Sequence, residues 1–327
     1  MKAIWYEGFG PARDVLVQDE LPDPVAGPGE VLVRLRSSGV NPSDVKLRAG
    51  ARAGAVMGWF RIVPHSDGAG IVEAVGEGVE AGRIGERVWI WNAGWQRQFG
   101  TAAEMVALPA DQAVRLPDGT SFAEGACLGI PAMTAWHAVF ADGPVAGKTV
   151  LVTGGAGTVG RYACQMARLG GARVIATVSS AVKAAHSTAE DWVNYRENDV
   201  AEVVGQMTGG QGVDRIIEVD FAANQAASLA LLKPGGTIAT YASASQMRPT
   251  LEFYPLMFRN VTLRMILVYL LDGDTRRQGE AALTGWLEAG ALSHAVCPAG
   301  GLANGVLAHE MVEAGDKLGT VVMEFDA

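Results

Sequence analysis

The chain has 327 residues, of which 49% are hydrophobic and 19% are charged, and its formal net charge is −9. This length exceeds what one hydrophobic core usually supports, so we expect two domains, and the acidic balance argues against nucleic acid or an anionic membrane as a partner. Three widely separated cysteines, Cys127, Cys164 and Cys297, argue against a disulfide framework and indicate a reducing compartment.

The first 120 or so residues show short strands joined by turns. Apolar runs at 2–6 and 31–35 flank a stretch rich in Pro and Gly, and residues 62–90 form a second β-rich block with many glycines. We expect a small, strongly bent barrel and no long helix before residue 122. The N-terminal segment lacks the apolar core of a signal peptide, and no apolar run is long enough to span a membrane, so we expect a cytoplasmic protein.

From Ser121 onward, strands and helices alternate. Ser121 and Glu124 have the spacing of a capping box, and a helical pattern follows through Ala141. Further helices are expected at 199–207, 224–232 and 278–289, and strands at 149–152, 173–178, 213–219, 237–241, 261–266 and 320–325. This alternation predicts an α/β fold with a doubly wound parallel sheet.

A glycine-rich loop joins the first of these strands to a helix. Gly155, Gly157 and Gly160 fit the G-x-G-x-x-G spacing, with a strand before the loop and a helix after it. The glycines allow a tight turn, a close approach of a pyrophosphate and close helix–strand packing, and the helix N-terminus offers N–H groups to phosphates. A loop that only turns the chain is the alternative, and the surrounding pattern disfavours it. The residues predicted to bind the dinucleotide here are Gly155, Ala156, Gly157, Thr158, Val159 and Gly160.

Five sequence runs point to a known family: PHSDGAGIVEAVGEGV at 64–79, GIPAMTAWHAVF at 129–140, VLVTGGAGTVG at 150–160, IIEV at 216–219 and LLKPGGTIATY at 231–241. They resemble the medium-chain dehydrogenase/reductase superfamily, and within it the zinc-independent quinone oxidoreductase (zeta-crystallin-like) branch. The resemblance implies a GroES-like catalytic domain made of residues 1–122 and 267–327. A Rossmann NADPH-binding domain at 123–266 is inserted into it.

The cofactor is predicted from the end of the second strand of the sheet. Residues 177–180 contain no carboxylate, which NAD-selecting folds usually place there. Ser179 and Ser180 leave room for a 2′-phosphate, and Lys183 and Tyr195 match positions that contact this phosphate in the resembled branch. We therefore predict NADPH, although Lys183 by itself is also consistent with an ordinary surface lysine.

The resemblance also implies that the site has no metal. Where related alcohol dehydrogenases have zinc ligands, this chain has Asn41, Ser66 and a position near Ile130. The histidines show no metal-binding spacing, and His65 is interpreted as a core or loop histidine. Without a Lewis acid, a conjugated acceptor suits the site better than an isolated ketone, because hydrogen bonds alone can hold the charge that develops on its oxygen.

Three side chains are candidates for the chemistry. Asn41 is expected to orient a substrate carbonyl, with a turn residue before a proline as the alternative. Ser43 matches the proton-relay hydroxyl of the family, but a helix N-cap is the favoured interpretation. By resemblance, the hydroxyl of Thr134 lies beside the nicotinamide, with a buried helical threonine as the alternative.

The remaining site residues are assigned from position and resemblance. Trp91 and Trp95 are candidates for the substrate pocket because their rings would stack on a flat acceptor. Tyr241 ends a strand at the sheet edge where doubly wound folds bind ligands. By resemblance, Ile266, Leu267 and Val268 pass the nicotinamide carboxamide, with core packing as an equal alternative.

These features predict an NADPH-dependent reductase of small quinones or other conjugated carbonyl compounds (enones). One alternative is a non-catalytic NADPH-binding redox sensor or structural protein. Another is a 2-enoyl thioester reductase, which the lack of a clear basic patch disfavours. Residues 261–271 form an apolar stretch longer than one strand needs, and in the resembled superfamily this strand pairs with its twin, so we expect a homodimer.

Overall fold

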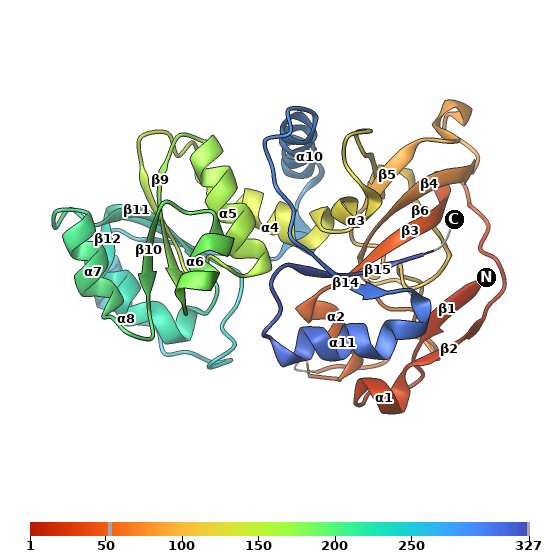
Figure 1. Ribbon diagram of the computed structural model, residues 1–327, viewed down its shortest axis with the longest axis horizontal. Coiled ribbons are helices and arrows are strands. Elements are labelled where there is room, and N and C mark those ends of the chain that lie inside the picture. The colour runs from red at the N-terminus through yellow and green to blue at the C-terminus, as the bar shows by residue number, and fades with distance from the viewer. Residues whose placement is uncertain (52–53, 326–327) are drawn as a thin grey trace. The chain divides into compact units, whose positions relative to one another are not determined.

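The computed structural model describes residues 1–51 and 54–325, and the chain divides into two compact units (Figure 1). Unit 1 comprises Met1–Ile130 and Arg276–Ala327, and unit 2 comprises Pro131–Thr275. The predicted boundaries, 122/123 and 266/267, come earlier in the chain than these divisions. The first division is later because helix α3 (Phe122–Gly125) packs on strands of unit 1.

Unit 2 is built on a parallel sheet of six strands in the order β10-β9-β8-β11-β12-β13. The chain enters the sheet at the central strand β8 and continues through β9 to the edge strand β10. It then returns to add β11, β12 and β13 on the other side of β8, so the strand order reverses between β8 and β11. This confirms the predicted doubly wound sheet. The strands are β8 (Thr149–Val152), β9 (Arg173–Val178), β10 (Asp191–Asn194), β11 (Val213–Glu218), β12 (Leu232–Thr240) and β13 (Thr262–Met265).

Helices cover both faces of this sheet, and Figure 1 shows α7 and α8 on one side and α4 and α5 on the other. Because the central strands are buried on both faces, they consist of nearly continuous apolar runs. Leu151, Ile175, Ile216 and Ile238 lie in one core cluster, and burying each such side chain contributes about 1.5–3 kcal/mol. The helices are α4 (Met133–Phe140), α5 (Thr158–Leu169), α6 (Ala181–Ser187), α7 (Val200–Met207), α8 (Phe221–Leu231) and α9 (Phe253–Phe258), with a 3-10 turn η4 (Val268–Leu270).

The helix predicted from 122 to 141 is interrupted. Its capping box forms as expected, because the Ser121 hydroxyl accepts the N–H of Glu124 at 3.2 Å and the Glu124 carboxylate accepts the N–H of Ser121 at 2.8 Å. However, α3 ends at Gly125, and a π-helical segment η3 (Leu128–Ala132) precedes α4. Pro131 lies in this segment, and a proline interrupts a regular helix because it has no N–H to donate.

Unit 1 contains a mixed, mainly antiparallel sheet of seven strands together with a separate pair, β1-β2. Strand β3 alternates half-buried and buried residues, and register shifts in its pairing with β4 bend the sheet as the predicted barrel requires. The strands are β1 (Lys2–Trp5), β2 (Val17–Glu20), β3 (Glu30–Val40), β4 (Asp67–Val75), β5 (Arg87–Ile90), β6 (Met105–Pro109), β7 (Ala113–Arg115), β14 (Val296–Gly300) and β15 (Thr320–Glu324).

The helices of unit 1 before residue 122 are short, as predicted, and α11 and β14 are elements that the sequence patterns did not predict. The helices are α1 (Ala12–Val15), α2 (Pro42–Arg48), α3, α10 (Gly273–Glu288) and α11 (Gly305–Ala314), with 3-10 turns η1 (Ala81–Arg83), η2 (Ala110–Gln112) and η5 (Leu302–Asn304). Helix α10 begins in unit 2 and continues into unit 1.

A buried pair of histidines joins α11 to the sheet of unit 1. His65 Nε2 lies 3.0 Å from His309 Nε2, and His65 Nδ1 lies 2.9 Å from the Ser38 hydroxyl. The two histidines are 2% and 0% exposed, so the interpretation of His65 as a core histidine is confirmed. Burial lowers the pKa of His65 well below its usual value, and burial together with the charge of Arg48 lowers the pKa of His309 to about 3.

This pair makes the free energy of unfolding depend on pH. Because both folded-state pKa values are lowered, the unfolded chain binds protons below about pH 6.5 that the folded protein excludes. The free energy of unfolding should therefore fall as the pH drops from about 7.5 to about 5, with a limiting slope of roughly 1.4 kcal/mol per pH unit for each histidine.

We expect His309→Leu to lower the free energy of unfolding at about pH 7.5 by roughly 1–3 kcal/mol, because the buried ring of His65 loses its partner. The variant should also lose about half of the pH dependence that the two histidines produce. Urea unfolding at the two pH values measures both effects, with His294→Leu in a loop as the control. An unchanged pH slope in His309→Leu would show that the pair does not control this dependence.

Candidate active site

The glycine-rich loop follows β8 and is tied to the end of β9. The Gly155 N–H donates to the Thr177 carbonyl at 3.0 Å, and the Gly154 N–H donates to the Thr177 hydroxyl at 3.0 Å. Gly157 is the N-cap of α5, and its N–H donates to the Gly154 carbonyl at 2.8 Å. The N-terminus of α5 is therefore held at the carboxyl edge of the sheet, where its first N–H groups can meet a pyrophosphate.

Each position of the motif favours glycine for a different structural reason. A Cβ on Gly155 would lie 2.6 Å from the Cβ of Ala176, and one on Gly160 would lie 2.3 Å from the Gly154 carbonyl oxygen. Gly157 is exposed, so its backbone can face a ligand. The left-handed residue of the turn is Gly154, with φ of +63°, a position that the spacing motif does not include.

A cavity of about 240 Å³ lies at the carboxyl ends of β8, β9 and β11. Thr153, Thr177 and Asp220 provide polar walls, while Leu151 and Val200 are among the apolar lining residues. Tyr195, predicted as a cofactor residue, also lines the cavity. An apolar floor with a few polar groups suits a purine ring and its ribose.

A buried glutamate organises the walls of this cavity, the candidate nucleotide cavity. Glu218 is 0% exposed, and its Oε1 accepts hydrogen bonds from the Thr153 hydroxyl at 2.9 Å, the Asp220 N–H at 2.6 Å and the Asn224 amide at 2.8 Å. Burial raises its pKa, and these donors lower it. Sequence reasoning used the IIEV run for the resemblance but did not assign a role to this carboxylate, because one of its donors, Thr153, is 65 residues away in the chain.

The other predicted cofactor residues also lie in unit 2. The Ser180 hydroxyl caps α6 by accepting the N–H of Lys183 at 3.3 Å, and Ser179 is buried beside it. Tyr241 follows β12, and its N–H donates to the Glu218 carbonyl at 3.2 Å. The remaining members are Thr134 in α4, Ala156 in the loop, Thr158 and Val159 in the first turn of α5, and Ile266, Leu267 and Val268 after β13. Thr134, Ala156, Ile266 and Val268 are buried, and Leu267 is exposed.

The second group of candidate residues lies in unit 1 around Asn41. Asn41 is 3% exposed, and its Nδ2 donates to Asp67 Oδ2 at 2.9 Å. The backbone N–H of Ile130 donates to the same carboxylate at 2.9–3.0 Å. Asp67 therefore joins the start of β4, the start of α2 and the segment around residue 130, and it fixes the orientation of the Asn41 amide.

The start of α2 corrects one interpretation. Asn41 is the N-cap, and Asp44 accepts its N–H at 2.8 Å. Pro42 is at the first helical position, which its fixed φ favours. Ser43 lies inside the first turn, so the prediction that it caps the helix is wrong. Its assignment as a relay hydroxyl stays a prediction.

Asp67 is the candidate site residue of unit 1 that sequence reasoning missed. It is 0% exposed, and burial raises its pKa well above the usual value, while the Ile130 N–H and the Asn41 amide partly offset this effect. In the sequence it is only one residue of the run PHSDGAGIVEAVGEGV at 64–79. Its partners are 26 and 63 residues away in the chain, so no local spacing links them.

The backbone around this group is unusual. Three of the five described non-glycine residues with positive φ, His65, Asn92 and Gln96, belong to the two segments beside it. The segments are joined by the Ala93 N–H donating to the Ser66 carbonyl at 3.0 Å. Such conformations tend to cluster at functional sites. Trp91 is 9% exposed and Trp95 is half-buried, so only a small part of the Trp91 ring is accessible.

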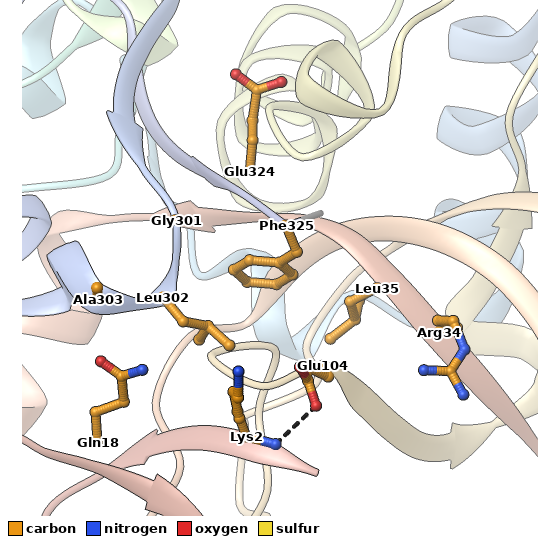
Figure 2. Close-up of a pocket in the computed structure, with 10 residues that line it drawn as sticks. All are labelled: Lys2, Gln18, Arg34, Leu35, Glu104, Gly301, Leu302, Ala303, Glu324 and Phe325. Carbon is orange, nitrogen blue, oxygen red and sulfur yellow. Dashed lines mark hydrogen bonds between the residues drawn. The ribbon is translucent and has the colours of Figure 1, made fainter. Parts of the chain in front are cut away.

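A separate cavity of about 520 Å³ opens in unit 1 near β1, β2 and β15 (Figure 2). Lys2, Arg34 and Glu104 line it, and the Glu104 carboxylate accepts the backbone N–H of Lys2 at 2.7 Å. No predicted site residue lines this cavity, so it is not the candidate active site.

Within the described residues, no helix is both long and apolar enough to cross a membrane.

A doubly wound sheet with a glycine-rich loop, set into a mainly antiparallel β domain, defines a dinucleotide-dependent dehydrogenase or reductase. Two family models match: "Alcohol dehydrogenase GroES-like domain" at residues 27–118 and "Zinc-binding dehydrogenase" at 158–284. Quinone oxidoreductase from Sus scrofa is 30% identical over 95% of this chain and 93% of its own length. The chain belongs to the medium-chain dehydrogenase/reductase superfamily, in its quinone oxidoreductase branch, and is an oxidoreductase.

Two further relatives show the range of this branch. A 2-haloacrylate reductase from a Burkholderia species is 30% identical over 99% of this chain and 98% of its own length. A solved structure of a mycobacterial protein in complex with NADPH has 31% identity and a TM-score of 0.87, and the match covers 99% of this chain and 100% of that one.

The residues of this chain do not fit a catalytic zinc, although one matching model is named for zinc-binding dehydrogenases. The Asn41 amide is held by Asp67, and Ser66 offers only a buried hydroxyl. Burial raises the pKa of the Cys127 thiol to about 12, so it does not supply a thiolate. Among residues 1–51 and 54–325, no group of three or more His, Cys, Asp or Glu is placed to hold a metal. The absence of zinc stays a prediction, and elemental analysis finding one zinc per purified chain would contradict it.

Proposed function

We propose that this protein transfers hydride from NADPH to quinones or other conjugated carbonyl compounds without a metal. The observation that carries the proposal is the amide of Asn41, held by the buried carboxylate of Asp67 where the resembled dehydrogenases have a zinc ligand. The names of the relatives agree with this chemistry, because a quinone and a 2-haloacrylate both contain a carbon–carbon double bond conjugated to a carbonyl group.

The amide nitrogen of Asn41 carries two hydrogens. Asp67 accepts one of them, and we assign the other to the oxygen of the acceptor. When bound, NADPH supplies the hydride, and the charge that then develops on the acceptor oxygen is held by this donor. Water or the Ser43 hydroxyl supplies the proton. Because Asp67 already fixes the amide, little reorganisation is needed during the reaction.

The cofactor would be held by the residues of unit 2. The N-terminus of α5 faces the pyrophosphate, and the cavity beside Thr153 and Tyr195 receives the adenosine. Ser179, Ser180 and Lys183 are assigned to the 2′-phosphate, and Thr134 to the nicotinamide. Tyr241 and residues 266–268 complete the assignment on the carboxyl side of β12 and β13.

Asn41→Ala should lower turnover about tenfold and leave NADPH affinity nearly unchanged, because water partly replaces the missing donor. We expect Asp67→Asn to lower turnover by a similar factor. The amide introduced at position 67 is itself a hydrogen-bond donor, so it competes with the Asn41 amide for acceptors. Asp67→Asn should also remove the contribution of Asp67 to the pH dependence of the free energy of unfolding, which opposes that of the two histidines. A carboxyl with a raised pKa favours the folded state below about pH 4, and this stabilisation is lost as the pH rises through its folded-state pKa.

Steady-state kinetics with a small para-quinone and a simple enone measure these effects, with Asp118→Asn, which changes a 96% exposed side chain, as the control. If the parent protein binds NADPH but reduces neither acceptor, the reductase proposal fails and a sensor role is favoured. If it reduces both and Asn41→Ala does so equally well, the reductase function survives but the role of Asn41 is wrong.

The preference for NADPH over NADH is a separate proposal. Lys183 lies in the first turn of α6, and no carboxylate stands at the end of β9. A charge-assisted hydrogen bond contributes about 1.5–3 kcal/mol. Lys183→Ala should therefore weaken NADPH binding roughly 10- to 100-fold and leave NADH binding unchanged. The binding constants are measured by fluorescence titration. Lys148→Ala is the control, because Lys148 precedes the amino end of β8 and so lies away from the carboxyl ends of the strands. Equal affinity of the parent protein for the two cofactors would rule out the preference.

We also propose that two copies pair through β13. This strand is at the edge of its sheet, and Met265 at its end and Phe258 in the preceding helix are 68% and 80% exposed. Exposed apolar edge strands promote pairing with another chain. Light scattering at micromolar concentration should give the mass of a dimer, and Met265→Lys should shift it toward a monomer, unlike Val182→Lys on α6. A monomer mass for the parent protein would contradict the proposal.

A further inference from the structure

A buried arginine lies beside the aromatic residue predicted for the substrate pocket. Arg276 is 4% exposed, and its guanidinium carbon is 3.6 Å from the centre of the Trp91 ring. It belongs to the part of α10 that lies in unit 1, as does Trp91. Stacking on an aromatic face stabilises a guanidinium and leaves the edge that carries its N–H groups to meet other ligands.

The charges around Arg276 are adjustable. It interacts electrostatically with Glu280, Asp111 and Asp67. Burial raises the pKa of Glu280 to about 7, so this carboxyl is not a fixed anion near neutral pH, and burial also raises the pKa of Asp67 well above its usual value. An anion that enters this group can therefore be accommodated when Glu280 takes up a proton.

We propose that Arg276 binds the carboxylate of an acceptor whose carbon–carbon double bond is conjugated to that carboxylate. Such an acid is harder to reduce than a quinone, because the charge delivered with the hydride spreads onto a group that is already anionic. One amide donor, such as Asn41, holds this extra charge poorly. A guanidinium can form two parallel N–H···O bonds to the two oxygens and carries the compensating charge.

The inference rests on the proposed reductase function and names one class of its substrates, the α,β-unsaturated carboxylates. In the reaction, the β-carbon gains the hydride of bound NADPH, which leaves as NADP⁺, and the α-carbon gains a proton from water. The carbon–carbon double bond becomes a single bond, and the carboxylate leaves unchanged in charge. Atoms and electrons therefore balance without a further reactant.

The test compares 2-chloroacrylate with its neutral methyl ester and with a small para-quinone, following NADPH oxidation. Arg276→Met keeps the stacking on Trp91 and removes the charge. It should lower kcat/KM for the acid roughly 10- to 100-fold and change the values for the ester and the quinone about threefold or less. Arg276→Lys keeps the charge but not the planar guanidinium, so its kcat/KM for the acid should lie between the values of the parent protein and Arg276→Met. Arg115→Met is the control, because the Arg115 side chain is 63% exposed and lies beside Glu288, the last residue of α10.

The pH profile supplies a second readout. Glu280 faces Arg276 and Arg277 on its own helix, Trp91 after β5 and Asp111 in η2. Binding of an anion favours protonated Glu280, so kcat/KM for the acid should fall as the pH rises through about 7, while kcat/KM for the ester stays flat. Glu280→Gln should remove this fall for the acid.

The outcomes separate the two proposals. If the quinone and the ester are reduced but the acid is not, or if Arg276→Met leaves the acid-to-ester ratio unchanged, the inference about Arg276 is wrong and the reductase function stands. If no acceptor is reduced, both fail. If Arg276→Met does not fold, inhibition of the parent protein tests whether it binds a carboxylate. The non-reducible acid 2-chloropropionate must then inhibit quinone reduction more strongly than its methyl ester, and equal inhibition overturns the inference.

Discussion

The candidate site of unit 1 depends on one buried carboxylate. Asp67 accepts hydrogen bonds from the side chain of Asn41 and from the backbone of Ile130, and it is fully removed from water. Burial of this kind is costly unless the oxygens are satisfied, so the three segments must stay in place for the carboxylate to be tolerated. The packing extends into the backbone: a Cβ at Gly129 would lie 2.2 Å from Asp67 Oδ1, so only glycine fits there.

Unit 2 has a similar buried carboxylate at the carboxyl ends of its parallel strands. Glu218 ends β11 and gathers donors from the end of β8 and the start of α8. It thereby sets the distance between two walls of the nucleotide cavity. In both units, a carboxylate with a raised pKa therefore joins neighbouring segments at one terminus of a strand: Asp67 at the start of β4 and Glu218 at the end of β11. The rest of each sheet is apolar packing that holds these strand ends in register.

The electrostatics of unit 1 follow from this arrangement. An amide oriented by a buried carboxylate offers a neutral donor, which suits a conjugated oxygen that gains charge only during the reaction. Arg276, stacked on Trp91 and close to Glu280, whose pKa burial raises to about 7, adds a positive charge whose balance can change when an anion arrives. The family assignment establishes an oxidoreductase, and we propose that these charges govern which acceptors it can use.

Local sequence patterns determined the parallel sheet, the glycine-rich loop and the capping box at Ser121, because each depends on residues within a few positions of one another. They also correctly excluded a long helix from the first part of the chain. The interruption of the helix after Gly125 could have been anticipated from Pro131 alone. The N-cap of α2 was assigned to Ser43 instead of Asn41 because Pro42 was not used to place the first turn.

Only the tertiary structure decided which polar side chains are buried together. Asn41 and Asp67 are 26 residues apart, Asp67 and Ile130 are 63 apart, and His65 and His309 are 244 apart. A hydrogen bond between such residues leaves no periodicity in the sequence, because its geometry is set by how separate strands and helices pack. The same is true of Arg276 and Trp91, whose contact depends on α10 returning to the β domain after the whole of unit 2 has been built. The sequence by itself therefore determined the scaffold and the nucleotide loop, and the folded chain determined the charges that the acceptor would meet.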